Sequence, residues 1–228
     1  MSNMTGSIPV CVKVVGSLNW DVINRVESHY EELQHKTFPN SERIKPCPGG
    51  HGANQAVAVY RASHQGPSSP SSPSSPSSPS HEKWLLPDIQ VCMIGMVGTD
   101  DDNRGEKIKR KLITNGVNVG GVKLAETDVP TGYAHIYVDT QGKPKIYNNP
   151  LANEELSGKV VEQELAKSPA ADLIMVQLEV PQDTVVKTIE YANKNKNPRH
   201  FQRCASIKWE QPLQPSADLQ SGSSNPQP

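Results

Sequence analysis

Gly49-Gly50-His51-Gly52-Ala53-Asn54-Gln55-Ala56 runs from three closely spaced glycines directly into a helical pattern that begins near Asn54. Glycine adopts positive φ and permits close backbone approach, and a helix N-terminus offers unpaired N–H groups with a partial positive charge. The segment therefore predicts either a backbone cradle for an oxygen-rich ligand or a plain glycine-rich turn before a helix, with equal weight. It is not a dinucleotide fingerprint, because Gln55 stands where the third glycine would be, and the sequence contains no P-loop.

Apolar, β-branched runs elsewhere in the chain predict buried parallel strands at residues 10–15, 89–97 and 172–178. Helical patterns lie between and after them at residues 54–62, 103–115, 154–167 and 184–194. This alternation predicts an α/β fold with a mainly parallel sheet and flanking helices. Residues 22–47 and 132–147 break the rhythm and predict a small antiparallel sheet that forms a lid.

Polar residues follow the predicted strands. Asn19 and Asp21 come after the first strand, and Glu179 comes after the last. Ligands of open α/β sheets bind at the carboxyl ends of the strands, so these side chains are expected to share one rim with the glycine segment and to bind a small polyol. Simpler interpretations are a strand-to-lid turn at Asp21, a helix-preceding position for Glu179, and helix capping by Asp100, Asp101 and Asp102.

Composition narrows the class of protein. The 228 residues carry a net charge of −1 without a basic block, which argues against nucleic acid as a partner. The sequence shows no signal-peptide pattern and no apolar stretch of membrane-spanning length. The four cysteines lack C-x-x-C spacing, so we expect reduced thiols, no bound metal, and a cytoplasmic location with the nucleus as the alternative.

Two segments have compositions that predict disorder. Residues 65–80 consist of Gln, Gly, Pro and Ser only, and residues 199–228 are rich in Pro, Gln and Ser. Such segments have too little apolar surface to offset the entropy lost on ordering. We therefore predict one domain at residues 10–198, interrupted by a disordered insertion at 64–83 and followed by a disordered tail.

Five short motifs occur in a characteristic order: G-S-x-N-x-D at 16–21, G-G-x-G-A-N-Q-A at 49–56, an approximate G-x-D-x-x-G-E at 98–106, P-T-G at 130–132 and Q-L-E-x-P at 177–181. In this order they resemble the ribokinase family of carbohydrate kinases, also called the PfkB family. The resemblance spans residues 12–197, excluding the Ser/Pro-rich segment.

The resemblance implies ATP-dependent phosphorylation of D-ribose or a similar sugar at its primary hydroxyl, with Mg²⁺ and a monovalent cation. It also implies a homodimer formed through the lid. It places the sugar against eight residues of this chain: Asn19, Asp21, Gly49, Gly50, His51, Gly52, Asn54 and Glu179. His51 departs from the family, where lysine usually stands, and imidazole is a poorer permanent cation than an ammonium. Sugar affinity or preference is expected to differ as a result.

In the resembling family, a Gly-Ala-Gly-Asp segment in the second half provides the anion hole and the catalytic base. This segment is absent from the 228 residues. The resemblance therefore covers the N-terminal part of the fold only, with the sugar site and without the ATP site or a catalytic residue. We expect the chain to be inactive alone. Non-catalytic sugar binding and an inert fragment are the alternatives.

Overall fold

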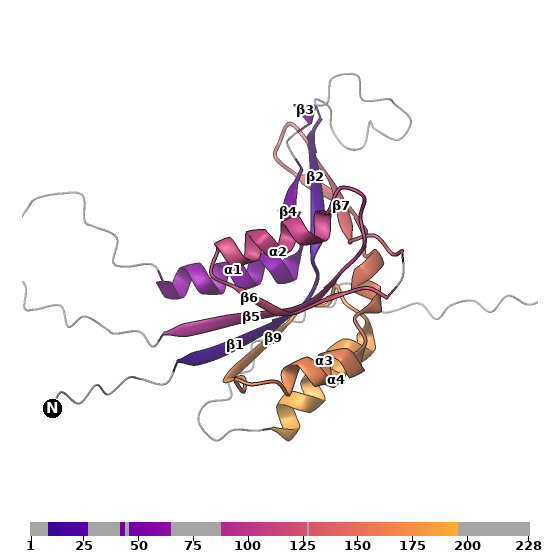
Figure 1. The fold of residues 1–228 in the computed structure, drawn as a ribbon. Coiled ribbons are helices and arrows are strands. Elements are labelled where there is room, and N and C mark those ends of the chain that lie inside the picture. Colours follow the sequence, from indigo (N-terminus) through magenta and orange to yellow (C-terminus); the bar gives the residue numbers. More distant parts are fainter. Residues whose placement is uncertain (1–8, 27–41, 44–45, 65–87, 127, 196–228) are drawn as a thin grey trace, which may run out of the picture.

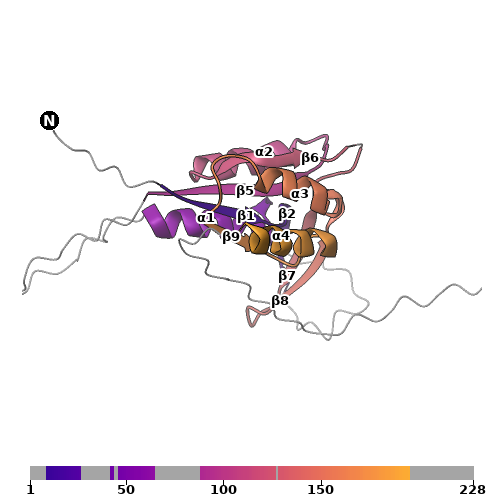
Figure 2. The same ribbon diagram turned by 90° about the horizontal axis from the view of Figure 1, so that it is seen from below.

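The computed structural model describes residues 9–26, 42–43, 46–64, 88–126 and 128–195. Their main feature is a four-stranded parallel sheet in the order β6-β5-β1-β9. Two helices lie on each side of the sheet, α1 and α2 on one and α3 and α4 on the other (Figures 1 and 2). The bounds are β1 Val10–Val15, β5 Ile89–Val97, β6 Asn118–Leu124, β9 Leu173–Val176, α1 His51–His64, α2 Arg104–Thr114, α3 Gly158–Leu165 and α4 Gln182–Lys194. The predicted α/β class is confirmed.

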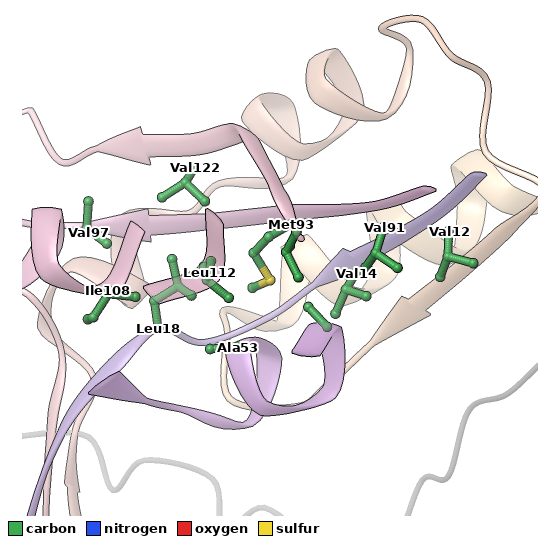
Figure 3. Packing of buried hydrophobic residues seen from close by; sticks show 12 residues of the cluster. Val12, Val14, Leu18, Ala53, Val91, Met93, Val97, Ile108, Leu112 and Val122 are labelled. Atoms are coloured by element: carbon green, nitrogen blue, oxygen red, sulfur yellow. The ribbon is translucent and has the colours of Figure 1, made fainter. Parts of the chain in front are cut away.

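The central strands are apolar because both of their faces are covered. One face packs against α1 and α2, and its buried side chains are shown in Figure 3. The sheet contributes Val12, Val14, Val91 and Met93 to this cluster, and the helices contribute Ala53, Ile108 and Leu112. The opposite face carries a second buried cluster: Val15, Ile94, Met96, Ala125, Ala152, Leu156, Val161 and Leu165.

A second, smaller sheet stands at the carboxyl ends of the main strands (Figure 1). It contains β2 Asn19–Arg25, β3 Glu42–Arg43, β4 Cys47–Gly49, β7 Tyr133–Val138 and β8 Pro144–Asn149. The small sheet is present as predicted, but its pairing is mixed, because β2 and β7 run parallel while the other pairs are antiparallel. β2 follows β1 and β7 follows β6, so both begin at the carboxyl ends of the main strands and run in the same direction.

Three local predictions need correction. The sequence reading omitted β6, whose Gly120 and Gly121 obscure the strand pattern and lie at a shift in its register with β5. The helix predicted at 154–167 is two elements, the 3₁₀ helix η2 Leu151–Glu155 and α3. Ser157 starts α3 anew, since its side chain accepts a hydrogen bond from the Val160 N–H at 3.4 Å. The helix predicted to begin near Asn54 begins at His51.

Several predictions concern parts of the chain outside the described residues. These are the insertion predicted at 64–83, the tail at 199–228 and most of the segment 22–47. The first residue of the predicted insertion, His64, is described and is the last residue of α1, so that bound is corrected. The domain boundary at residue 198 stays a prediction as well. Within the described ranges, no helix is long and apolar enough to cross a membrane.

Candidate sugar-binding site

The loops at the carboxyl ends of β1 and β9 meet the start of α1. Ser17 lies at the junction, where its hydroxyl donates to Glu179 Oε2 at 2.6 Å and accepts from the His51 N–H at 3.1 Å. The His51 ring also lies against this carboxylate, with Nδ1 2.8 Å from Glu179 Oε1. The structure thus brings Glu179 and His51 together, although they are far apart in the sequence.

Asp21 lies on β2 beside the same group. Burial and the nearby Glu179 carboxylate raise the pKa of Asp21 to about 6, although a backbone hydrogen bond from Gly50 and the His51 ring act in the opposite direction. Gly49 makes room for this carboxylate, because a Cβ on Gly49 would lie 1.8 Å from Asp21 Oδ2. Burial and a neighbouring carboxylate both disfavour the charged form of Asp21. Carboxyl groups with a pKa perturbed in this way are typical of functional sites.

Two glycines of the segment have different structural roles. Gly50 has φ of +93°, a conformation that side-chain-bearing residues rarely adopt, and it turns the chain into α1. Gly52 lies where α1 crosses the end of β1, and a Cβ there would be 2.7 Å from the Gly16 carbonyl carbon. The segment is therefore a turn that starts a helix, and it borders the Asp21 and Glu179 carboxylates. Its use as a ligand cradle stays a prediction.

Asn19 points into a buried amide network that sequence reasoning did not foresee. Its Oδ1 accepts from Asn153 Nδ2 at 2.8 Å, and its Nδ2 donates to Asn148 Oδ1 at 3.2 Å. Asn153 comes from η2 and also bonds both backbone groups of Leu18, accepting from the N–H at 2.9 Å and donating to the carbonyl at 3.2 Å. Asn153 therefore fixes the chain between β1 and β2, and with it the position of Asn19.

Asn54 occupies the first turn of α1 with an exposed side chain. It lines a cleft of about 290 Å³ between α1 and α2, together with Val57, Arg61 and Leu112. Of the eight predicted sugar-binding residues, Asp21, Gly49, Gly50, His51 and Glu179 form one group. Asn19 is anchored beneath it by the amide network, Gly52 packs behind it, and Asn54 faces this cleft.

Of the three aspartates expected to cap α2, Asp100 is the one that accepts a hydrogen bond from a backbone N–H of the helix, whereas Asp102 pairs with Arg104 at 3.0 Å. The Asp100 Oδ2 accepts from the Gly105 N–H in the first turn of α2 at 3.3 Å, and its Oδ1 accepts from the Thr131 N–H at 3.0 Å. The Thr131 hydroxyl in turn contacts the Gly98 N–H at 3.0 Å. These bonds hold the beginning of β7, and so the small sheet, against the end of β5.

The raised pKa of Asp21 predicts a pH-dependent effect of one substitution. The folded state favours the neutral form, so the contribution of Asp21 to stability is fully present below its ordinary pKa of 3.8 and is lost as pH rises through about 6. Asp21→Asn should therefore increase the free energy of unfolding by about 1 kcal/mol at neutral pH, after discounting for solvent screening, and by much less near pH 4. Urea unfolding at both pH values measures this. A destabilised Asp21→Asn variant at neutral pH would contradict it.

Chemically, the site offers two carboxylates and a helix N-terminus around one position. Carboxylates accept hydrogen bonds from hydroxyl groups, and each hydroxyl of a polyol can both donate and accept. The arrangement therefore suits a small polyhydroxylated ligand. No group of three or more His, Cys, Asp or Glu side chains in the described part of the chain is arranged to hold a metal ion.

Fold and site together define an α/β protein with a polar site beneath a small sheet. Comparison with known proteins identifies its family. A model of the pfkB family of carbohydrate kinases matches residues 11–221, and the chain belongs to this family. A ribokinase of Schizosaccharomyces pombe is 30% identical over 192 residues, which make up 81% of this chain and 50% of that protein.

Solved structures show the same fold. Ribokinase from Giardia lamblia superimposes with a TM-score of 0.60 at 23% identity, covering 81% of this chain and 47% of that one. Arabidopsis thaliana ribokinase, solved with ribose and ATP, gives 0.53 at 20% identity, covering 82% and 51%. The chain thus spans about half the length of the relatives it matches.

Proposed function

We propose that this chain carries the sugar site of a ribokinase-type carbohydrate kinase and binds D-ribose or a similar sugar. The observation that carries the proposal is the convergence of Asp21, Glu179 and the Gly50–His51 backbone at the carboxyl ends of β1 and β9. In this proposal both carboxylates accept hydrogen bonds from sugar hydroxyls. The choice of sugar is supported by the family membership and by the similarity to ribokinases, one of which was solved with ribose.

The family's reaction transfers a phosphoryl group from ATP to the primary hydroxyl of the sugar, and ATP with Mg²⁺ belongs to this proposal only through the family. Phosphoryl transfer needs charge stabilisation and a group that accepts the hydroxyl proton. The Gly-Ala-Gly-Asp segment is absent from residues 1–228, and the carboxylates at the described site lie beside each other and His51. These residues do not fit a nucleotide site, and we expect no phosphorylation by this chain alone.

The dimer implied by the resemblance also remains a proposal. It is supported by β8, whose residues are all exposed and include Ile146 and Tyr147, about half accessible to solvent. Consecutive strand residues point to opposite faces, so each face of β8 carries one accessible apolar side chain, and β8 is suited to burial against a second copy of the small sheet.

Titration calorimetry of the full chain with D-ribose tests the sugar site directly. We expect saturable binding that Asp21→Asn weakens by about 30-fold, because hydrogen bonds to charged groups contribute about 1.5–3 kcal/mol. Folded protein with no detectable ribose binding would refute the proposal. A coupled assay with ATP measures the reaction separately, and sugar phosphate above background would overturn the expected lack of turnover while leaving the sugar site intact.

Gly49→Ala should weaken ribose binding without unfolding the chain. The added Cβ displaces the Asp21 carboxylate, which is the end of a short side chain that can rotate away. We expect about a tenfold loss of affinity and a stability change below about 1 kcal/mol. Gly120→Ala is a matched control, since a Cβ there lies no closer than 3.2 Å to its neighbour. Equal ribose affinities of the two variants would contradict this prediction.

A further inference from the structure

A pair of thiols lies on the face of the main sheet that α3 and α4 cover, apart from the sugar site. Cys11 is on β1 and Cys92 is on β5, and the two side chains are joined by a hydrogen bond. Cys11 is buried, with 2% of its surface exposed, whereas Cys92 is partly exposed and lines a cavity of about 160 Å³. Cys92 is therefore the member of the pair that a small molecule can reach.

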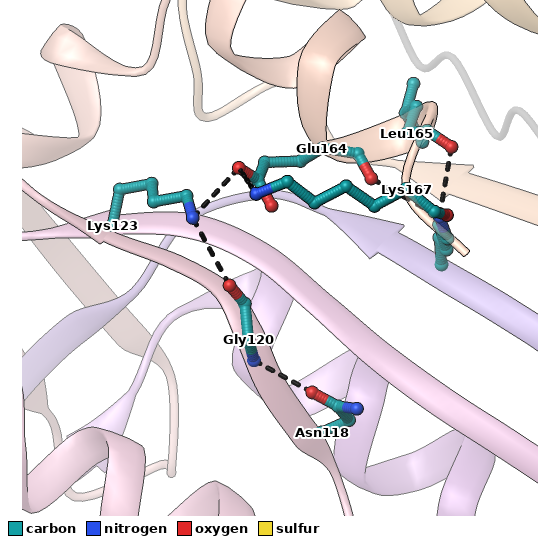
Figure 4. Close-up of polar contacts among 7 residues, drawn as sticks. Asn118, Gly120, Lys123, Glu164, Leu165 and Lys167 are labelled. Carbon is teal, nitrogen blue, oxygen red and sulfur yellow. Dashed lines mark hydrogen bonds and ion pairs between the residues drawn. The ribbon is translucent and has the colours of Figure 1, made fainter. Parts of the chain in front are cut away.

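The cavity beside Cys92 is rich in positive charge. Lys13, the register partner of Cys92 on β1, is only 3% exposed and lines the cavity with Lys167. Figure 4 shows Glu164 held between Lys123 and Lys167, with its Oε1 2.9 Å and 2.6 Å from their ammonium groups. Lys123 and Lys167 contact the Glu164 carboxylate, while the Lys13 ammonium binds the Glu164 backbone carbonyl. Three ammonium groups against one carboxylate leave a positive local charge, which favours an anionic ligand and a negatively charged sulfur.

The two sulfurs also differ in their surroundings. The hydrogen bond from Cys11 is the main cause that lowers the pKa of Cys92, and the Lys13 ammonium adds to it against the effect of burial. Cys11 keeps its proton, because its hydrogen bond to Cys92 and its burial raise its pKa. The Asp172 carboxylate, whose Oδ2 accepts from the Cys11 N–H at 2.8 Å, makes a smaller contribution in the same direction. Cys47 is exposed, yet its pKa is raised by desolvation and by Asp21.

An internal disulfide does not fit the register of the strands. Cys11 pairs with Gln90, so Cys92 is displaced by two residues along the neighbouring strand. A displacement of about 6.6 Å along the strand and about 4.8 Å across it separates the Cα atoms by about 8 Å. Disulfides require less than about 7 Å without backbone movement, so the partner sulfur must come from outside.

We propose that Cys92 is a modification site that forms a mixed disulfide with an anionic low-molecular-weight disulfide, such as oxidised glutathione, at the surface beside the cavity that Lys13 and Lys167 line. Cys92 first loses its proton to solvent, and its thiolate attacks one sulfur of the small disulfide. A new S–S bond forms to that sulfur and the original S–S bond breaks. The other half leaves as a thiolate and takes up a proton from water, so Cys92 is oxidised and half of the small molecule is reduced.

The experiment uses the full chain with Cys204→Ser. Cys11, Cys47 and Cys92 are then the thiols that can react with the small disulfide. The chain is incubated with oxidised glutathione at pH about 6.5, and adducts are located by peptide mass spectrometry. Cys92 should react several-fold faster than Cys47 despite its smaller exposure, and Cys92→Ser should abolish the fast adduct. Cystamine, a cationic disulfide, should lower the ratio of Cys92 to Cys47 labelling. Faster labelling of Cys47, or no such charge preference, would overturn the proposal.

Two variants of Cys11 examine the role of the hydrogen bond. Cys11→Val removes the donor and should shift the pH midpoint of Cys92 labelling upward from about 7, while Cys11→Ser, which retains a hydroxyl donor, should restore part of the shift. An unchanged midpoint in folded Cys11→Val refutes the assigned role. If that variant does not fold, the parent chain decides, since a midpoint at or above the ordinary thiol value of about 8.5 contradicts the proposal.

Discussion

Asn153→Leu is expected to lower the free energy of unfolding by about 4 kcal/mol, although leucine has nearly the same size and shape. Asn153 is 1% exposed, and the substitution leaves both backbone groups of Leu18 and the Asn19 Oδ1 atom without their partner. The carbonyl of Pro150 loses a bond of 3.0 Å as well. Each buried polar group left unpaired costs about 1–3 kcal/mol, so several together outweigh the gain from burying an apolar side chain.

Urea unfolding followed by circular dichroism measures this difference. Asn148→Ala is the matched control, because Asn148 contacts the same Asn19 side chain from an exposed position on β8. We expect the control to cost less than about 1 kcal/mol. Similar losses for the two variants would show that the buried amide network does not fix the junction of β1 and β2.

Lys13→Met should be the second large effect, with a loss of about 3 kcal/mol. Lys13 lies in the middle of the central strand β1. Its ammonium group donates to three backbone carbonyls at the end of α3 or just after it: Glu164 at 3.3 Å, Leu165 at 3.0 Å and Lys167 at 2.7 Å. The last carbonyls of a helix have no partner within it, so Lys13 supplies what α3 lacks. Methionine recovers the cost of burying a charge but leaves these carbonyls unpaired.

Lys187→Met serves as the comparison, because Lys187 forms an exposed pair with Glu190 at 2.7 Å within α4. Such pairs contribute about 0.5 kcal/mol or less, so this variant should unfold at nearly the same urea concentration as the parent. If Lys13→Met also stays within that margin, the terminal carbonyls of α3 do not depend on the lysine. Circular dichroism in the helical region would then show no loss for either variant.

The sequence predicted the parts of the fold that depend on local patterns. The apolar runs of β1 and β5 mark strands covered on both faces, and the glycines at 49–52 mark the turn into α1. Motif order also led to Asp21 and Glu179, which the structure brings to one rim. What local patterns omit is distant pairing. Asn153 is 135 residues from Leu18, and nothing in the segment around it indicates that it would join the site from below.

The errors have physical causes of the same kind. A two-glycine interruption conceals β6, because the pairing with β5 compensates for a weak local preference. The break between η2 and α3 depends on the cap at Ser157, which a continuous helical pattern conceals. The role of Lys13 was invisible in an apolar run, since its partners are carbonyls of a helix about 150 residues away.

The central place of β1 in the main sheet has a consequence for how the chain folds during synthesis. Among the described strands of the main sheet β1 comes first in the sequence, and its neighbours follow much later: Cys11 and Asp172, at the edge of the β1–β9 pairing, are 161 positions apart. At about 5–20 residues per second, a ribosome needs roughly ten seconds or more to produce that stretch. Contacts of such long range also slow folding itself. β1 therefore leaves the ribosome well before its second partner strand exists, and during that interval its apolar side chains cannot be buried against that strand.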